Sequence, residues 1–140
     1  MRVKLTIEYD GTDYCGWQIQ PNGTSVQQVI TNAIKKVTGE TVKLIGSGRT
    51  DAGVHALGQV AHFDTNSAVP ADKFSNALNA VLPADVKIVM SERADDSFNA
   101  RFSAKKKTYE YHIYVSPFPR PLKSRYAAQI CYPVNVEAMN

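Results

Sequence analysis

Apolar and polar residues alternate along the first segment of the chain. The apolar positions of this segment are Val3, Leu5, Ile7 and Tyr9. Because successive side chains of a strand point to opposite faces, this period of two predicts a strand with one buried face. Asp10 and Gly11 follow it, and both are typical of a turn, so we expect the strand to end there.

A second segment has the period of a helix. Ser25 stands three residues before Gln28, which is the spacing of a capping box, in which the serine accepts a backbone N–H and the glutamine side chain reaches back. The apolar positions after Ser25 are Val26, Val29, Ile30, Ala33, Ile34 and Val37. They form one stripe on a helix that Gly39 is expected to end. In the loop before it, Tyr14 and Trp17 are expected to pack internally.

Further strands are expected at residues 41–45, 58–64, 86–90 and 107–115, with a short one at 126–132. A second helix is expected between Pro70 and Pro83. The resulting order, β-α-β-β-α-β-β, predicts an α+β fold in which a mostly antiparallel sheet has both helices on one face. This is the ferredoxin-like arrangement, which RRM-like RNA-binding modules share.

In the strand expected at residues 107–115, alternation divides the side chains between two faces. One face would contain Tyr109, Tyr111, Ile113 and Val115, and the other Glu110, His112 and Tyr114. From burial statistics alone, Tyr109 is more often an aromatic side chain of the core than a binding residue.

The composition is that of an ordinary globular protein. The chain has 140 residues, a length that fits one domain, with 44% apolar and 21% charged residues. Its apolar runs are short and no charged leader precedes one, so we expect no membrane segment and a cytoplasmic protein. Cys15 and Cys131 are too few for a disulfide framework, and the histidines lack the spacing of a zinc site, so no metal is expected.

The net charge of +3 permits an acidic partner such as nucleic acid without requiring one. The basic residues gather in the last quarter of the chain, at Lys105, Lys106, Lys107, Arg120, Lys123 and Arg125. Together with Arg101 the lysines could contact phosphates, but a charge run at the start of a strand is more often simply solvated.

The glycine-rich stretch at residues 46–63 is the main candidate for chemistry. Its glycines surround Arg49 and Asp51, and glycine allows positive φ angles and close approach by a ligand. The sequence Thr-Asp-Ala-Gly around Asp51 is also ordinary turn chemistry, because a short carboxylate bonds its own backbone. Alternatively, Arg49 orients the Asp51 carboxylate and keeps it ionised in a partly buried cleft; a structural salt bridge would look the same.

Three motifs resemble the TruA family of tRNA pseudouridine synthases. Residues 48–56 read GRTDAGVHA and match the family's GRTDxGVHA block, and further matches follow at Gln59, Val60 and Phe63. Residues 9–18 contain the family's Y-D-G-x-x-Y-x-G-W-Q element, and residues 98–104 read FNARFSA, a third family segment. Nine consecutive matches in a polar segment make this resemblance far more specific than a lone glycine motif.

The resemblance implies roles for three residues. Asp51 would be the nucleophile, Arg49 would help to extrude the target uridine, and Tyr109 would lie against the base and assist removal of its C5 proton. Uridines 38, 39 and 40 in the anticodon stem-loop of tRNA would be isomerised to pseudouridine without a cofactor. His55 would belong to the hydrogen-bonding framework of the motif. The family also implies a homodimer in which each tRNA reaches both subunits.

The family further implies that residues 1–140 are the N-terminal domain of a protein roughly twice as long. The second half carries the family's arginine that pairs with the catalytic aspartate, and this sequence has no counterpart of it. We therefore expect the chain alone to have little or no activity.

Two other functions stay open at this point. The first is an RNA-binding module without catalysis, which fits the order of strands and helices but lacks the aromatic RNP1 pattern. The second is half of an aspartic protease, because Asp51-Ala52-Gly53 is similar to Asp-Thr/Ser-Gly; the hydrophobic residues expected before that aspartate are replaced by Arg49-Thr50.

Overall fold

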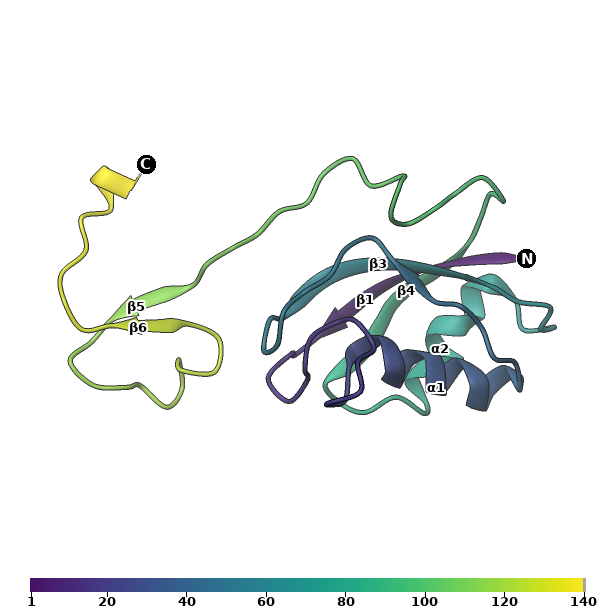
Figure 1. The fold of residues 1–140 in the computed structure, drawn as a ribbon, viewed down its shortest axis with the longest axis horizontal. Helices are drawn as coiled ribbons and strands as arrows, with labels where there is room; N and C mark the ends of the chain where they lie inside the picture. The colour runs from purple at the N-terminus through teal and green to yellow at the C-terminus, as the bar shows by residue number, and fades with distance from the viewer. Residues whose placement is uncertain (140) are drawn as a thin grey trace. The chain divides into compact units, whose positions relative to one another are not determined.

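The computed structural model describes residues 1–139 and contains two compact units (Figure 1). The first unit is Met1–Lys105, and the second begins at Lys106. The first unit contains both helices and four of the six strands.

A four-stranded antiparallel sheet forms the first unit. Its strands lie in the order β2 (Ile45–Gly46), β3 (Ala56–Asp64), β1 (Arg2–Tyr9) and β4 (Val86–Ala94). Helices α1 (Val26–Thr38) and α2 (Phe74–Asn79) cover the same face of this sheet, and a 3-10 turn, η1 (Ala71–Lys73), leads into α2 (Figure 1). The expected α+β fold with both helices on one face is confirmed.

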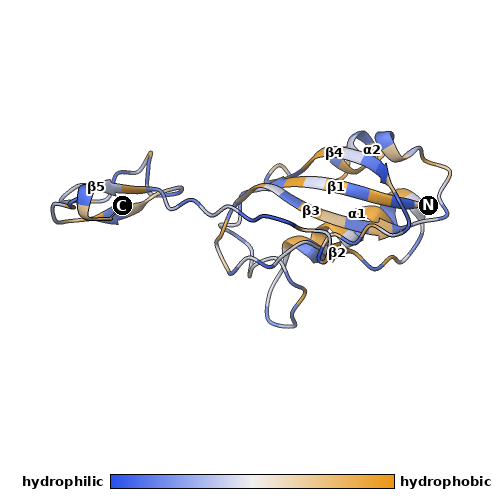
Figure 2. Cartoon of the chain, turned by 90° about the horizontal axis from the view of Figure 1, so that it is seen from above, coloured by the Kyte–Doolittle hydropathy of each residue, from blue (hydrophilic) through white to orange (hydrophobic). Residues whose placement is uncertain are grey.

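The core lies between β1 and the two helices. Val3, Leu5 and Ile7 of β1 are fully buried and alternate with polar residues, as the sequence predicts. Figure 2 shows hydrophobic and hydrophilic stretches along β1. The ring of Phe63 on β3 meets the ring of Phe74 on α2 edge-on, with 5.3 Å between the ring centres. Burying an aliphatic or aromatic side chain of this size stabilises the fold by about 1.5–3 kcal/mol.

Helix α1 begins and ends where the sequence predicts. Ser25 Oγ accepts the Gln28 N–H at 3.2 Å, and Gly39 takes the left-handed conformation that ends the helix, with φ of 76°. The return half of the capping box does not form, since no hydrogen bond of the Gln28 side chain occurs among residues 1–139. Gln27 makes the side-chain contact instead, donating to the Leu44 carbonyl at 2.9 Å.

The strand expected at residues 41–45 is wrong in extent, because β2 contains only Ile45–Gly46. Leu44 is buried, but its carbonyl accepts the Gln27 side chain of α1 rather than a neighbouring strand. Residues 41–44 therefore lie outside the sheet, and Leu44 is held by α1. The strand expected at 86–90 is longer, at Val86–Ala94, because β1 pairs with it along its whole length.

The helix expected between Pro70 and Pro83 is confirmed but short, with α2 restricted to Phe74–Asn79. Its last residue, Asn79, contacts β4 through its side chain. The side-chain amide donates to the Ile88 carbonyl at 2.9 Å and accepts the Ile88 N–H at 2.8 Å. Asn79 thus occupies backbone groups of β4, an edge strand of the sheet, that would otherwise be open to another strand.

The second unit corrects the strand expected at residues 107–115. Only β5 (Ile113–Val115) is a strand, and it pairs in parallel with β6 (Ala128–Ile130), inside the strand expected at 126–132. The His112 carbonyl still accepts the Ala128 N–H at 2.8 Å, but residues 107–111 pair with no strand among the described residues. Tyr109 and Tyr111 are exposed, so Tyr109 is not a core aromatic; of the three tyrosines expected on this strand, Tyr114 is the buried one.

The unit ends in a 3-10 turn, η2 (Glu137–Met139). Over residues 1–139, no helix combines the length and the apolar character needed to cross a membrane.

The N-cap of α1 gives a test of this fold. Replacing Ser25 by alanine removes the oxygen that accepts the Gln28 N–H, and should lower the free energy of unfolding by about 1 kcal/mol. Thr24→Ala changes an exposed neighbour and should be nearly neutral. Urea unfolding followed by circular dichroism measures both; equal stabilities of the two variants would contradict the assignment.

Candidate functional site

The loop that contains Asp51 joins β2 to β3. Within it the Val54 N–H donates to the Asp51 carbonyl at 3.2 Å, and Gly53 has a φ of 79°, which together define a turn that requires glycine at its third position. The turn expected from composition is therefore present. It also places Asp51 at the surface, because residues 51–54 are all exposed.

Gln59 of β3 holds the arm of the loop that precedes Arg49. Its amide nitrogen donates to the Gly48 carbonyl at 2.7 Å, and its amide oxygen accepts the Ser47 hydroxyl at 3.0 Å. The Ser47 N–H also donates to the Val60 carbonyl at 2.7 Å. One side chain thus extends the strand pairing by two residues beyond Gly46, toward the candidate residues.

The loop after β1 holds the middle of the Asp51 loop from the other side. The hydroxyls of Tyr9 and Thr50 lie 2.7 Å apart, and the Trp17 N–H donates to the Thr50 carbonyl at 3.0 Å. The Gly53 N–H donates to the Tyr14 carbonyl at 3.3 Å. Tyr14 and Trp17 are buried, which confirms the expectation that they pack internally.

Two glycines allow these loops to approach so closely. A Cβ at Gly16, whose φ is 104°, would lie 2.5 Å from the Thr50 carbonyl oxygen. A Cβ at Gly11 would overlap the Val54 carbonyl group. Since a backbone carbonyl cannot move aside like the end of a flexible side chain, both positions require glycine.

His55 also joins the two loops. Its Nδ1 accepts the Gly11 N–H at 3.0 Å and lies 3.1 Å from a carboxylate oxygen of Asp10. These contacts agree with the expected role of His55 in the hydrogen-bonding framework. Among residues 1–139, no three His, Cys, Asp or Glu side chains gather in a way that could hold a metal ion.

Comparison with known proteins identifies the family. A family model described as tRNA pseudouridine synthase matches residues 5–103, the part of the chain that contains both loops and all of the four-stranded sheet except the first three residues of β1. The chain belongs to the TruA family of tRNA pseudouridine synthases. It is 53% identical over 137 residues to tRNA pseudouridine synthase A of Thermoanaerobacter pseudethanolicus, 54% over 137 residues to that of Caldicellulosiruptor bescii and 45% over 141 residues to that of Limosilactobacillus reuteri.

These alignments cover nearly all of this chain and little more than half of each relative. They include 98% of the chain and 56% of the relative for the first two, and 99% and 55% for the third. The chain therefore spans about half the length of the curated TruA relatives that it matches.

Within the TruA domain, Asp51 and Arg49 share one loop but do not pair. Both side chains belong to exposed residues, and no ion pair joins them in residues 1–139. The Asp51 carboxylate likewise makes no hydrogen bond with a described residue. The expectation that Arg49 is a buried partner of Asp51 is therefore wrong for this structure, because both residues are exposed and form no ion pair with each other.

Tyr109 belongs to the second unit, in the segment that precedes β5. Its side chain is 65% exposed and lies on no strand. The suggested role of Tyr109 beside the target base stays a prediction.

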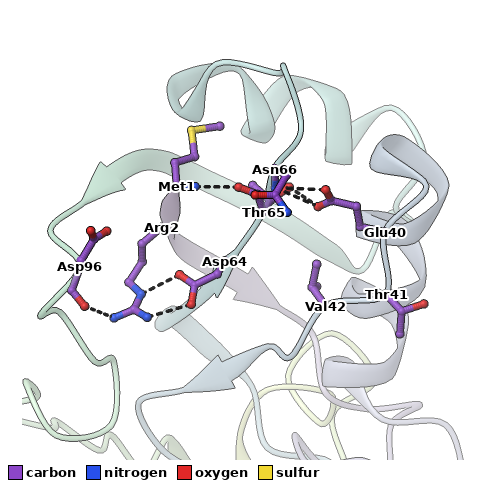
Figure 3. Close-up of a pocket in the computed structure, with 9 residues that line it drawn as sticks. All are labelled: Met1, Arg2, Glu40, Thr41, Val42, Asp64, Thr65, Asn66 and Asp96. Atoms are coloured by element: carbon purple, nitrogen blue, oxygen red, sulfur yellow. Dashed lines mark hydrogen bonds and ion pairs between the residues drawn. The ribbon is translucent and has the colours of Figure 1, made fainter.

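A surface hollow of about 540 Å³ lies at the opposite end of β1 from the Asp51 loop (Figure 3). In it, Arg2 contacts the Asp64 carboxylate through two nitrogens at 2.8 Å each. The two ends of β1 are roughly 23 Å apart at the usual rise of a strand. The hollow is therefore separate from the candidate site of this TruA domain.

Sequence reasoning missed the supports of the site. Gln59 and Gly16 entered only as motif matches, and Gly11 also as a turn residue. The sequence held one signal for these supports. Both loops carry a glycine-containing motif of the same family, which is compatible with a contact between them.

The close approach of the loops predicts a specific sensitivity to alanine. Gly16→Ala should lower the free energy of unfolding by about 3 kcal/mol, because the new Cβ meets the Thr50 carbonyl and the φ angle disfavours alanine. Gly58→Ala is the matched control, since its Cβ would lie 3.8 Å from Thr6 Cγ2, an ordinary contact. It should stay within about 0.5 kcal/mol of wild type in urea unfolding. Equal losses in both variants would refute the close approach.

Proposed function

We propose that this chain forms the N-terminal part of a tRNA pseudouridine synthase in which Asp51 is the nucleophile. Membership of the TruA family supports the reaction class. The observation that supports Asp51 is the state of its side chain: it is exposed on a turn held from two sides, and no described residue binds its carboxylate. The Asp51 carboxylate is therefore accessible to a nucleoside that has been extruded from an RNA helix.

The chemistry needs an ionised carboxylate and no outside atom. The bond from uracil N1 to ribose C1′ breaks and a bond from C5 to C1′ forms, while the C5 proton is removed and N1 takes up a proton. The product is an isomer of the substrate. Asp51 can attack C1′ as N1 leaves, or it can add to the uracil ring; either route regenerates the carboxylate when C5 has bonded to C1′.

Arg49 and Tyr109 receive supporting roles. Atoms of a base inside a stacked helix are out of reach, so the target uridine has to be extruded. Arg49 is two residues from Asp51, exposed and without an ion pair to Asp51, and its guanidinium can enter the vacated space and contact phosphate. Tyr109 is exposed and can lie against the extruded base and assist loss of the C5 proton.

The substrate and partners follow from the family. We propose uridines 38, 39 and 40 of the tRNA anticodon stem-loop as targets, and a cytoplasmic homodimer as the working assembly. Because the chain spans about half the length of its relatives, the rest of such a protein would complete the site. The chain alone should be weakly active or inactive.

The role of Asp51 can be tested in a protein that contains this chain together with the remaining length of its relatives. Asp51→Asn should reduce isomerisation by at least about 1,000-fold, because the amide has no charge to attack with. Release of tritium from tRNA labelled at uridine C5 measures the rate. Asp13→Asn, at an exposed aspartate of the neighbouring loop, should leave the rate unchanged.

The outcomes separate the two functions that remain. A rate retained by Asp51→Asn would exclude this aspartate as the nucleophile. The incomplete coverage of the relatives favours a second candidate, an RNA-binding module without catalysis. It would be supported by tRNA binding that is equal in wild type and Asp51→Asn, with no tritium released by the longer protein.

A further inference from the structure

The segment after β4 lies on the sheet face opposite the helices. Two guanidinium nitrogens of Arg2 bind the Asp64 carboxylate, and the third nitrogen donates to the Phe98 carbonyl at 2.8 Å and to the Asp96 carbonyl. The ammonium group of Lys4 lies 5.7 Å from the centre of the Phe98 ring. Arg2 and Lys4 alternate with the buried side chains of β1 and therefore belong to the other face.

This segment ends in a turn with its own internal hydrogen bonds, which we call the 98–103 turn. The Asn99 side-chain oxygen accepts the Arg101 N–H at 3.0 Å and the Phe102 N–H at 3.3 Å. The Ser103 N–H donates to the Asn99 carbonyl at 2.7 Å. These hydrogen bonds fix the conformation of the turn from within. Its position on the sheet therefore depends on the few contacts that attach it there.

His62 of β3 makes the central attachment. It is 2% exposed, and its Nδ1 accepts the N–H of Ala100, which is also 2% exposed, at 3.1 Å. Its ring meets the Phe98 ring edge-on, with 5.8 Å between centres. A backbone N–H can only donate, so Nδ1 has to be unprotonated, and the ring proton of the neutral imidazole is on Nε2.

The surroundings of His62 favour the neutral form. The charged groups on the elements around it include Arg2 and Lys4 of β1, Asp64 of β3, Glu92 of β4, and Asp95, Asp96 and Arg101 of the covering segment. Burial lowers the pKa of His62 below its ordinary value of 6.5, the charge of Arg2 lowers the pKa further, and Asp64 opposes both. The unfolded chain therefore binds the proton more readily, and stability falls as the pH drops below 6.5 and through the folded pKa.

We propose that His62 is a positioning residue: its neutral imidazole ties the 98–103 turn to β3, the strand that begins at the Asp51 loop, and protonation releases the turn. The turn is part of the family segment FNARFSA and ends two residues before the boundary at Lys105. His62 thus links the two segments that carry family motifs on either side of β4. The part of this proposal that concerns catalysis rests on the proposed function.

The first test uses the chain itself and needs no activity. His62→Leu removes the acceptor, so the Ala100 amide should exchange its hydrogen at least about tenfold faster at pH 7.5 in NMR exchange experiments. His62→Asn places an amide oxygen near the position of Nδ1 and should keep Ala100 protected. His112→Leu changes an exposed histidine and should leave Ala100 as in wild type. Amides of β1 report whether each variant is folded.

The second test measures how protection of the Ala100 amide depends on pH. In wild type, Ala100 should lose protection as the pH falls below 6.5, while His62→Asn should not show this loss because it does not titrate there. In the longer synthase, kcat should fall over the same range in wild type and stay flatter in His62→Asn. Equal Ala100 exchange in wild type and His62→Leu would overturn the attachment.

A pH profile of kcat that is the same in wild type and His62→Asn would overturn the positioning role. If the longer wild-type protein releases no tritium, the proposed function fails, and Ala100 exchange still decides whether His62 holds the turn.

Discussion

The candidate site depends on the close approach of two backbone segments. The Thr50 carbonyl and the Val54 carbonyl occupy the space where Gly16 and Gly11 would carry side chains. Each contact is made by backbone or by a residue other than Asp51. The position of Asp51 is therefore fixed without any bond to its carboxylate, and that group keeps its full capacity to bind or react.

This arrangement reconciles the two interpretations of Asp51 that the sequence allowed. A residue at the first position of a turn is ordinarily structural, and here the Asp51 carbonyl does accept the turn hydrogen bond from Val54. The structural work is done by the backbone oxygen, however, and the carboxylate takes no part in it. A turn made by the backbone is thus compatible with chemistry at the side chain.

Local periodicity predicted the elements whose burial is local, and it failed where a distant partner decides. The alternation of β1 and the stripe and caps of α1 follow directly from their own residues. Residues 107–115 have the same alternation, but a strand needs a partner, and β6 offers only three residues. The motifs likewise indicated Asp51 and Arg49, whereas the contact of His62 with Ala100 joins residues 38 positions apart and leaves no trace in local pattern.

The register of β3 against β1 connects these observations. Gln59 lies opposite Ile7 and His62 opposite Lys4, and their odd spacing directs the two side chains to opposite faces of the sheet. A slip of one residue would turn Gln59 away from the Asp51 loop and His62 away from the 98–103 turn, and would also expose Ala61 and Phe63. The apolar alternation excludes that slip because it would remove Phe63 from the core. The same hydrophobic pattern that forms the sheet therefore also sets both polar contacts, that of Gln59 with the Asp51 loop and that of His62 with the 98–103 turn.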